Sequence, residues 1–366
     1  MAYRTVTFTL IFMMFFTPVC KACIWDYDTL AMERLAFPGT HELIVGHFVR
    51  HSSAYYRWRI DDRSSTPEES RTPADYDDIA AAHDKLGEHE KAIEIIKAKI
   101  ERWPNEFRYE SEANLGTFLI HSGDLETGLV HIKKAIEINP DAHFGREIYQ
   151  QRLVEYILEG QTGKDQISFY KFLSTDESGK SRSLSEAEVN KAIKGIAGMM
   201  RFGNYDSPIL LSALASLLKG SERKTNMVAC RAYLMASYQT DDKLQAAKFR
   251  AQASNSVFFQ ESHDLERVES ELKEEIAQAE ALFAQIESDE IAWAESGLNL
   301  DEKFKAKYYD APLLKLAASS NLMSNIYVLA ECVILITCGL FIAYRLWIYF
   351  NDPRTIPKLQ HEIRQC

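Results

Sequence analysis

Two consecutive stretches of the chain share one pattern, and this pattern decides the fold. The first, Tyr76–Pro104, reads YDDIAAAHDKLGEHEKAIEIIKAKIERWP, and the second, Glu112–Pro140, reads EANLGTFLIHSGDLETGLVHIKKAIEINP. Each contains a glycine at which a first helix can end and closes on a proline that cannot continue a second helix. The glycines, Gly87 and Gly123, are 36 residues apart, and so are the two prolines. The period predicts tandem helix–turn–helix units.

These units resemble the tetratricopeptide repeat family, whose repeat is a helix pair of about 34 residues. Small residues occupy the positions at which paired helices approach closely, and Lys99 stands where the family usually has alanine, which predicts weaker packing there. The matching positions are Tyr76, Ile79, Ala80, Gly87, Ala92, Ile96, Ile100 and Pro104 in the first unit, and Leu115, Gly116, Gly123, Asp124, Gly128, Ile132, Ala135, Ile136 and Pro140 in the second.

The remainder of the body is also predicted to be helical. Residues 74–173 form the repeat region, because an amphipathic stretch over 144–158 can stack on the second unit. A polar linker over 174–184 precedes a helical region over 185–325, which opens with a Ser185–Glu188 capping box. Within that region we expect a degenerate helix pair at 207–219 and 225–238. A long amphipathic helix should follow over 262–296, lying on the repeats because it has too few heptads for a coiled coil.

The first 22 residues are typical of a secretory signal. A basic start at Arg4 precedes an apolar run over 6–16, and the small residue Ala22 offers a cleavage position. An uncleaved anchor is the alternative. Cleavage would place Cys23 at the new N-terminus, where lipidation is a minor alternative because Lys21 does not suit a lipobox.

A second apolar stretch predicts a transmembrane helix over 326–350. Residues 326–344 read IYVLAECVILITCGLFIAY, which is long enough to cross the hydrocarbon core. Basic residues follow it, so the tail over 351–366 is expected to be cytoplasmic and the body exported, into the periplasm if the cell is Gram-negative. A buried core helix is the alternative interpretation.

Charge and cysteine content limit the expected partners. Removing the +2 of residues 1–22 and the +1 of residues 326–366 from the total of −11 leaves about −14 on residues 23–325. This acidic body disfavours nucleic acid and anionic lipid headgroups as partners. Cys23 and Cys230 are the only cysteines of the body and could form a disulfide in an oxidising compartment.

The segment over 23–73 is dense in aromatic, arginine and histidine residues and is not a repeat unit. It is similar to the leader region of uncharacterised exported bacterial repeat proteins. His47 and His51 are four residues apart and with His41 suggest a metal site, although no H-E-x-x-H motif is present. A recognition patch is another interpretation, formed by Tyr55, Arg57, Trp58 and Arg59. Packing of the aromatic residues on the first repeat, with the arginines paired to acidic groups, is the interpretation we favour.

The sequence predicts a binding protein and no enzyme. It contains neither a glycine-rich phosphate loop nor a G-x-S-x-G motif, and it indicates no cofactor. Resemblance to the repeat family implies a groove for a protein or peptide, with a basic or polar segment expected. The groove positions that the resemblance implies are Asp77, Ala81, Asp84, Lys85, Ala113, Thr117, Ile120 and His121.

The predicted whole is therefore all-α: a short, right-handed stack of repeats, a long helix and one C-terminal membrane helix. Its predicted function is that of a membrane-anchored scaffold for protein–protein interaction. An envelope metal-binding protein or hydrolase with a site in residues 23–63 is one alternative. A self-assembling structural protein is the other.

Overall fold

The computed structural model describes residues 39–141, 145–161, 167–175, 179–220, 225–257 and 265–309. All of them belong to the first of two compact units, which cover residues 1–317 and 318–366. The predicted signal (1–22), transmembrane helix (326–350) and tail (351–366) lie outside the described residues. Among the residues that are described, no helix combines the length and the apolar character needed to cross a membrane.

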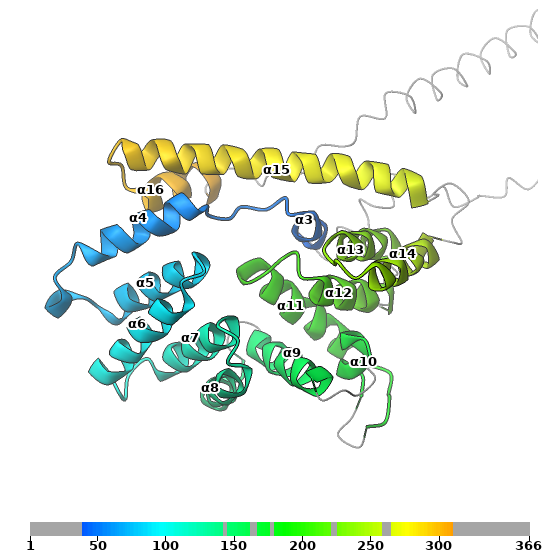
Figure 1. The fold of residues 1–366 in the computed structure, drawn as a ribbon, viewed down its shortest axis with the longest axis horizontal. Helices are drawn as coiled ribbons and strands as arrows, with labels where there is room; N and C mark the ends of the chain where they lie inside the picture. The colour runs from blue at the N-terminus through cyan, green and yellow to red at the C-terminus, as the bar shows by residue number, and fades with distance from the viewer. Residues whose placement is uncertain are drawn as a thin grey trace, which may run out of the picture. The chain divides into compact units, whose positions relative to one another are not determined.

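The described residues confirm the all-α class (Figure 1). In the same part of the chain, pairing of β type is limited to an isolated bridge between Thr175 and Ser181. The helices are α3 (Thr40–Val45), α4 (Ser53–Ser64), η1 (Glu68–Ser70), α5 (Pro73–Lys85), α6 (His89–Arg102), α7 (Arg108–His121), α8 (Leu125–Ile138), α9 (Arg146–Gln161), α10 (Phe169–Leu173), α11 (Glu186–Phe202), α12 (Pro208–Gly220), α13 (Asn226–Tyr238), α14 (Lys243–Val257), α15 (Leu265–Glu295), α16 (Leu300–Phe304) and η3 (Lys305–Tyr309).

Helices α5–α6 and α7–α8 are the two predicted helix pairs. A capping box formed by Thr72 and Asp75 opens α5, and Pro73 at its first position fits because that position needs no donor. The turns contain Gly87 and Gly123, whose φ angles of 77° and 93° are unfavourable for other residues. Each pair therefore turns at the glycine that the sequence indicates.

The two helices of the second pair, α7 and α8, pack closely because each has a glycine that faces the other helix. A Cβ on Gly116 would lie 2.9 Å from the Ile132 side chain, and one on Gly128 would lie 2.8 Å from the Gly116 carbonyl oxygen. In the first pair the corresponding small residues, Ala80 and Ala92, are fully buried. The predicted role of small residues is thus consistent with the packing.

The expectation that Lys99 weakens the repeat needs correction. Its side chain is fully buried, and its ammonium lies 2.7 Å from Asp77 Oδ2. The Asn114 amide also donates to Asp77, so a polar contact between α6, α5 and α7 replaces the apolar contact that alanine would make.

The helices from α9 onward form the second half of the described unit. Helices α12 and α13 are the predicted degenerate pair, and the Ser185–Glu188 capping box opens α11 as expected. Helices α9–α13 enclose the larger hydrophobic core, to which α3 and α15 also contribute. The smaller core lies between α5, α6 and α7.

The long helix α15 completes a closed circuit of helix contacts. It is one continuous helix that packs on α13, on α14 and on the neighbouring α3 in the second half, and on α4 and α16 at the other side (Figure 1). From α4 the contacts continue through α5 to α9, then α11, α12 and α13, and so return to α15. The predicted long helix is confirmed, but its main contacts are with α3, α4, α13, α14 and α16 and not with the repeats on which it was expected to lie. The periodicity of the sequence does not indicate this bridging position.

Candidate functional site

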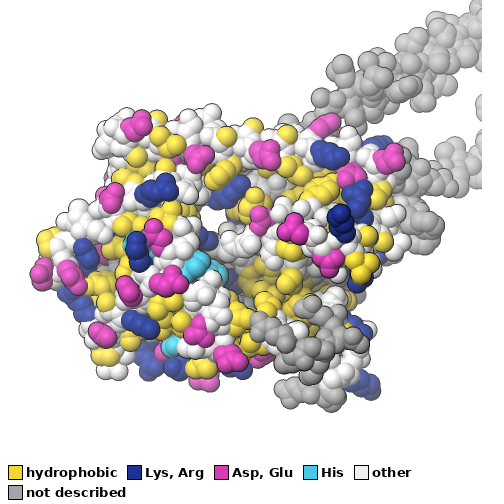
Figure 2. All heavy atoms as spheres, viewed as in Figure 1, with side chains coloured by type: hydrophobic (Ala, Val, Ile, Leu, Met, Phe, Trp, Pro, Cys, Tyr) yellow, Lys and Arg dark blue, Asp and Glu magenta, His cyan; other side chains and the backbone are white. Residues whose placement is uncertain are grey.

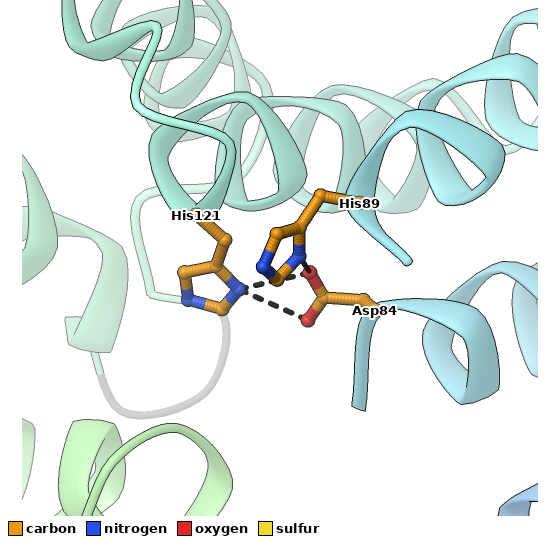
Figure 3. Close-up of side chains that lie close together, drawn as sticks. All are labelled: Asp84, His89 and His121. Carbon is orange, nitrogen blue, oxygen red and sulfur yellow. Dashed lines mark hydrogen bonds and ion pairs between the residues drawn. The ribbon is translucent and has the colours of Figure 1, made fainter. Parts of the chain in front are cut away.

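Three side chains from the first two repeats converge at one point: Asp84, His89 and His121, here called the histidine cluster (Figure 3). Asp84 lies in the last turn of α5, His89 begins α6, and His121 ends α7. The Gly87 turn brings Asp84 and His89 together although four residues lie between them, and the packing of α7 against α5 adds His121. The cluster is therefore held by helix ends.

The Asp84 carboxylate lies between the two imidazoles. His89 Nδ1 is 2.8 Å from Asp84 Oδ1, and His121 Nδ1 is 3.0 Å from both carboxylate oxygens. The imidazole rings are 5.7 Å apart, centre to centre. Asp84 is nearly buried, with 5% of its side chain exposed, whereas His89 and His121 are 27% and 35% exposed. The carboxylate is therefore sheltered behind two accessible rings.

Electrostatics keep the cluster carboxylate ionised. Burial alone would raise the pKa of Asp84, but the hydrogen bonds and charges of His121 and His89 outweigh that effect, so the pKa lies below its ordinary value. The Asp84 carboxylate therefore interacts with the two histidines of the cluster.

Lys85 extends the site towards the second half of the molecule. Its ammonium donates to the carbonyl of Phe202, at the end of α11, 117 residues away in sequence. Phe202 is 63% exposed, and the Arg146 guanidinium lies 5.5 Å from the centre of its ring. Burial lowers the pKa of the Lys85 ammonium, although the charge of Asp84 acts in the opposite direction. We call Lys85, Arg146 and Phe202 the rim.

Figure 2 shows this face of the molecule hollowed between the helices of the first repeats and those above them. Histidine side chains and basic side chains border the hollow in this view. The histidine cluster and the rim are adjacent in the chain through Asp84 and Lys85, and the rim carries the exposed ring of Phe202.

The structure separates six of the eight predicted groove residues into two sets. Asp84, Lys85 and His121 come together as described. The Asp77 carboxylate instead pairs with the Lys99 ammonium and accepts a hydrogen bond from the Asn114 amide. Thr117 donates to the Ala113 carbonyl and accepts a hydrogen bond from Gln150, and Ile120 packs where Gly128 leaves room.

Sequence reasoning missed His89 and the rim residues Arg146 and Phe202. A signal for His89 was present, since a carboxylate and a histidine on either side of a glycine turn can face each other. For Phe202 there was no local signal, because its proximity to Lys85 depends on the path of the whole chain.

The predicted recognition patch is mostly turned inward. Tyr55 is buried and donates to Asp301, and the Arg59 guanidinium lies near the same carboxylate. Trp58 stacks obliquely near Tyr55, and only Arg57 of the four is exposed. Pairing of an arginine with an acid, one part of the favoured interpretation, agrees with the contact between Arg59 and Asp301 of α16. The ring of Tyr55, which was expected on the first repeat, instead lies against His51 and against Phe304 of α16.

The premise of the N-terminal metal site is wrong. His47 and His51 do not share a helix face, because α3 ends at Val45 and α4 begins at Ser53. His41 instead lies 2.9 Å from Glu275, and His51 lies 2.7 Å from Glu290, two different carboxylates of α15. These contacts attach the N-terminal segment to the long helix.

The predicted disulfide stays a prediction. Cys230 is fully buried within α13, and Cys23 lies outside the described residues.

No family model matches the chain, and no curated protein matches it. Among solved structures, the TPR2AB-domain:pHSP90 complex of yeast Sti1 aligns with 14% identity, covering 70% of this chain and 100% of that chain, at a TM-score of 0.27. The two backbones do not superpose as wholes at that score, so the tetratricopeptide-like description depends on the helix pairs themselves.

Proposed function

We propose that this chain is a scaffold that binds a segment of another protein at the rim and the histidine cluster. The observation that supports this proposal is that His121 lies against Asp84 while the neighbouring Lys85 reaches the carbonyl of Phe202, whose ring is 63% exposed. Accessible aromatic and cationic side chains gathered at one place are typical of protein-binding surfaces. The absence of enzymatic activity stays a prediction.

The contacts refine the expected chemistry of the partner. Asp77 and Asp84 are occupied by internal partners, so a basic peptide would find little unpaired negative charge. The accessible groups are imidazole rings, an ammonium and an aromatic ring. A polar segment with acceptors such as backbone carbonyls, and one apolar side chain to cover Phe202, fits them better.

The cellular location is a separate proposal that depends on sequence alone. The apolar stretches over 1–22 and 326–350 support an exported body with a membrane anchor. Labelling of single cysteines, introduced on the body or in the tail, by a membrane-impermeant reagent in intact cells tests this topology. Labelling of the tail but not of the body would contradict it.

Site-specific photo-crosslinking in the native cell tests the scaffold proposal. A benzophenone amino acid replaces Phe202 of the rim in one variant and the partly exposed His89 of the histidine cluster in another. Val130 is the matched control, because it is also an exposed apolar residue and lies on α8, which adds nothing to the histidine cluster or the rim. We expect both test positions to capture the same partner and the control to capture none.

Loss of this capture in a Lys85→Ala/His121→Ala variant would support the location of the site. Capture of a second copy of the chain alone would support self-assembly and contradict the scaffold proposal. Equal capture from Val130 would contradict the proposed face.

A further inference from the structure

We propose that the histidine cluster is a binding site for a divalent first-row transition metal such as Zn²⁺. Two imidazole nitrogens and one carboxylate oxygen, from Asp84, His89 and His121, lie within 4.8 Å of one another. Imidazole is a preferred ligand of zinc, copper, iron and nickel, and carboxylate is compatible with them. The site goes beyond the scaffold proposal and does not depend on it.

The three ligand atoms need little rearrangement to accept an ion. Tetrahedral coordination with bonds of about 2.0–2.1 Å places ligand atoms about 3.4 Å apart. The two imidazole nitrogens already lie 2.8 and 3.0 Å from Asp84 Oδ1, so a small outward rotation of side chains is enough. An ion would then replace the protons that these hydrogen bonds now share.

The helix ends hold the ligands from three directions. The turn between Asp84 and His89 is closed by backbone hydrogen bonds from Gly87 to Asp84 and from Glu88 to His83. His121 precedes a turn of the same kind, in which Gly123 donates to Ile120. Because backbone conformation sets these positions, the ligands lose little further conformational freedom on binding an ion.

Charge and access also suit a cation. The one carboxylate of the cluster is nearly buried, while the exposed edges of the two imidazoles leave a path for entry. Lys85 is the nearby cation that would oppose binding, but its ammonium is directed to the carbonyl of Phe202. With three protein ligands, a fourth position remains for water.

The test is metal titration of the purified full-length protein, in the absence of any partner. Co²⁺ serves as the spectroscopic probe, because four-coordinate Co²⁺ absorbs visible light far more strongly than hexahydrated Co²⁺. We expect saturable binding of one ion with an intense visible band, displaced by Zn²⁺, and proton release on binding. Binding should weaken at least tenfold in His89→Gln and in His121→Gln.

His131→Gln is the matched control, because His131 also pairs with a carboxylate, that of Glu112, but lies outside the histidine cluster. It should bind Co²⁺ as the wild type does. Unsaturable binding, a spectrum of six-coordinate cobalt, or unchanged affinity in both His89→Gln and His121→Gln would overturn the proposal.

Asp84→Asn provides a second variant if either histidine variant unfolds, with far-UV circular dichroism as the check on folding. Retention of wild-type affinity in a folded Asp84→Asn protein would also overturn the site. Because no partner takes part, failure here is distinguishable from failure of photo-crosslinking at Phe202.

Discussion

At the scale of single residues, the notable feature is a lysine at the centre of a helical repeat. Lys99 is fully buried and its charge is compensated by Asp77, whose side chain is 26% exposed. Burying a lysine is costly unless its charge is paired, so the favourable contribution of this pair depends on both partners being present. In this repeat the Lys99–Asp77 ion pair therefore replaces the small apolar contact that an alanine at position 99 would make.

Replacement of one partner should destabilise the protein more than replacement of both. Lys99→Met keeps the length of the side chain but leaves Asp77 without its cation, and we expect a loss of about 2 kcal/mol in unfolding free energy. Asp77→Asn/Lys99→Met should recover most of that loss, because no unpaired charge remains. Urea unfolding followed by circular dichroism measures both. A double variant as unstable as Lys99→Met would contradict the proposed cause.

At the scale of helices, close approach of α7 and α8 depends on glycine. The position that a Gly116 Cβ would take is occupied by the Ile132 side chain and backbone, each 2.9 Å away. Helix α11 also contains glycine, yet a Cβ on Gly198 would meet only the flexible Arg146 side chain, at 3.4 Å. The same substitution should therefore have opposite effects in the two helices.

Gly116→Ala should destabilise the protein by about 1–3 kcal/mol, because the added methyl group forces the two helices apart. Gly198→Ala is the control, and there the higher helix propensity of alanine should leave stability unchanged or raise it by up to about 1 kcal/mol. Thermal and urea unfolding of the two variants give the comparison. Equal destabilisation by both would show that close packing is not the reason for Gly116.

At the scale of the whole described unit, α15 connects the two halves through buried charges. Glu275 lies on α15 and accepts hydrogen bonds from Arg231 on α13, while His41 on α3 lies 2.9 Å away. Arg231 also contacts Glu271, one turn earlier on α15. Further along, Glu290 accepts the Ser52 amide and lies 2.7 Å from an imidazole nitrogen. These contacts close the circuit of helices.

Because Glu275 connects α15 to α13 and α3, its protonation should lower the stability of the fold in acid. Burial would raise the pKa of Glu275, but the charges and hydrogen bonds of Arg231 and His41 lower it to about 2, from an ordinary value of 4.5. The ionised Glu275 carboxylate therefore stabilises the fold above about pH 4.5, and this stabilisation is lost as pH falls towards 2. The contribution is about 3 kcal/mol, from the size of the shift.

We expect the unfolding free energy of the wild type to fall between pH 5 and pH 3, and Glu275→Gln to remove part of this fall while lowering stability at pH 7. Urea unfolding across this range provides the measurement. Glu280→Gln, at an exposed position on the same helix, is the control and should retain the wild-type dependence. An identical pH profile in Glu275→Gln would contradict the assigned role.

The sequence by itself determined the local structure of this protein. Glycine at a positive φ angle, proline at a helix end, caps and the helical period act within a few residues, so α5–α8, α11 and α15 could all be predicted. Half of the candidate site could be predicted as well, namely Asp84, Lys85 and His121, because the family resemblance placed them on the inner helices of the repeats.

Only the tertiary structure decided which of these elements meet. The contact of Lys85 with Phe202 spans 117 residues, and that of His41 with Glu275 spans 234. Such contacts depend on the accumulated angles of many packed helices, which no local pattern specifies. The same reason explains why the N-terminal histidines attach to α15 as structural contacts, while His89, near a simple glycine turn, became part of the histidine cluster.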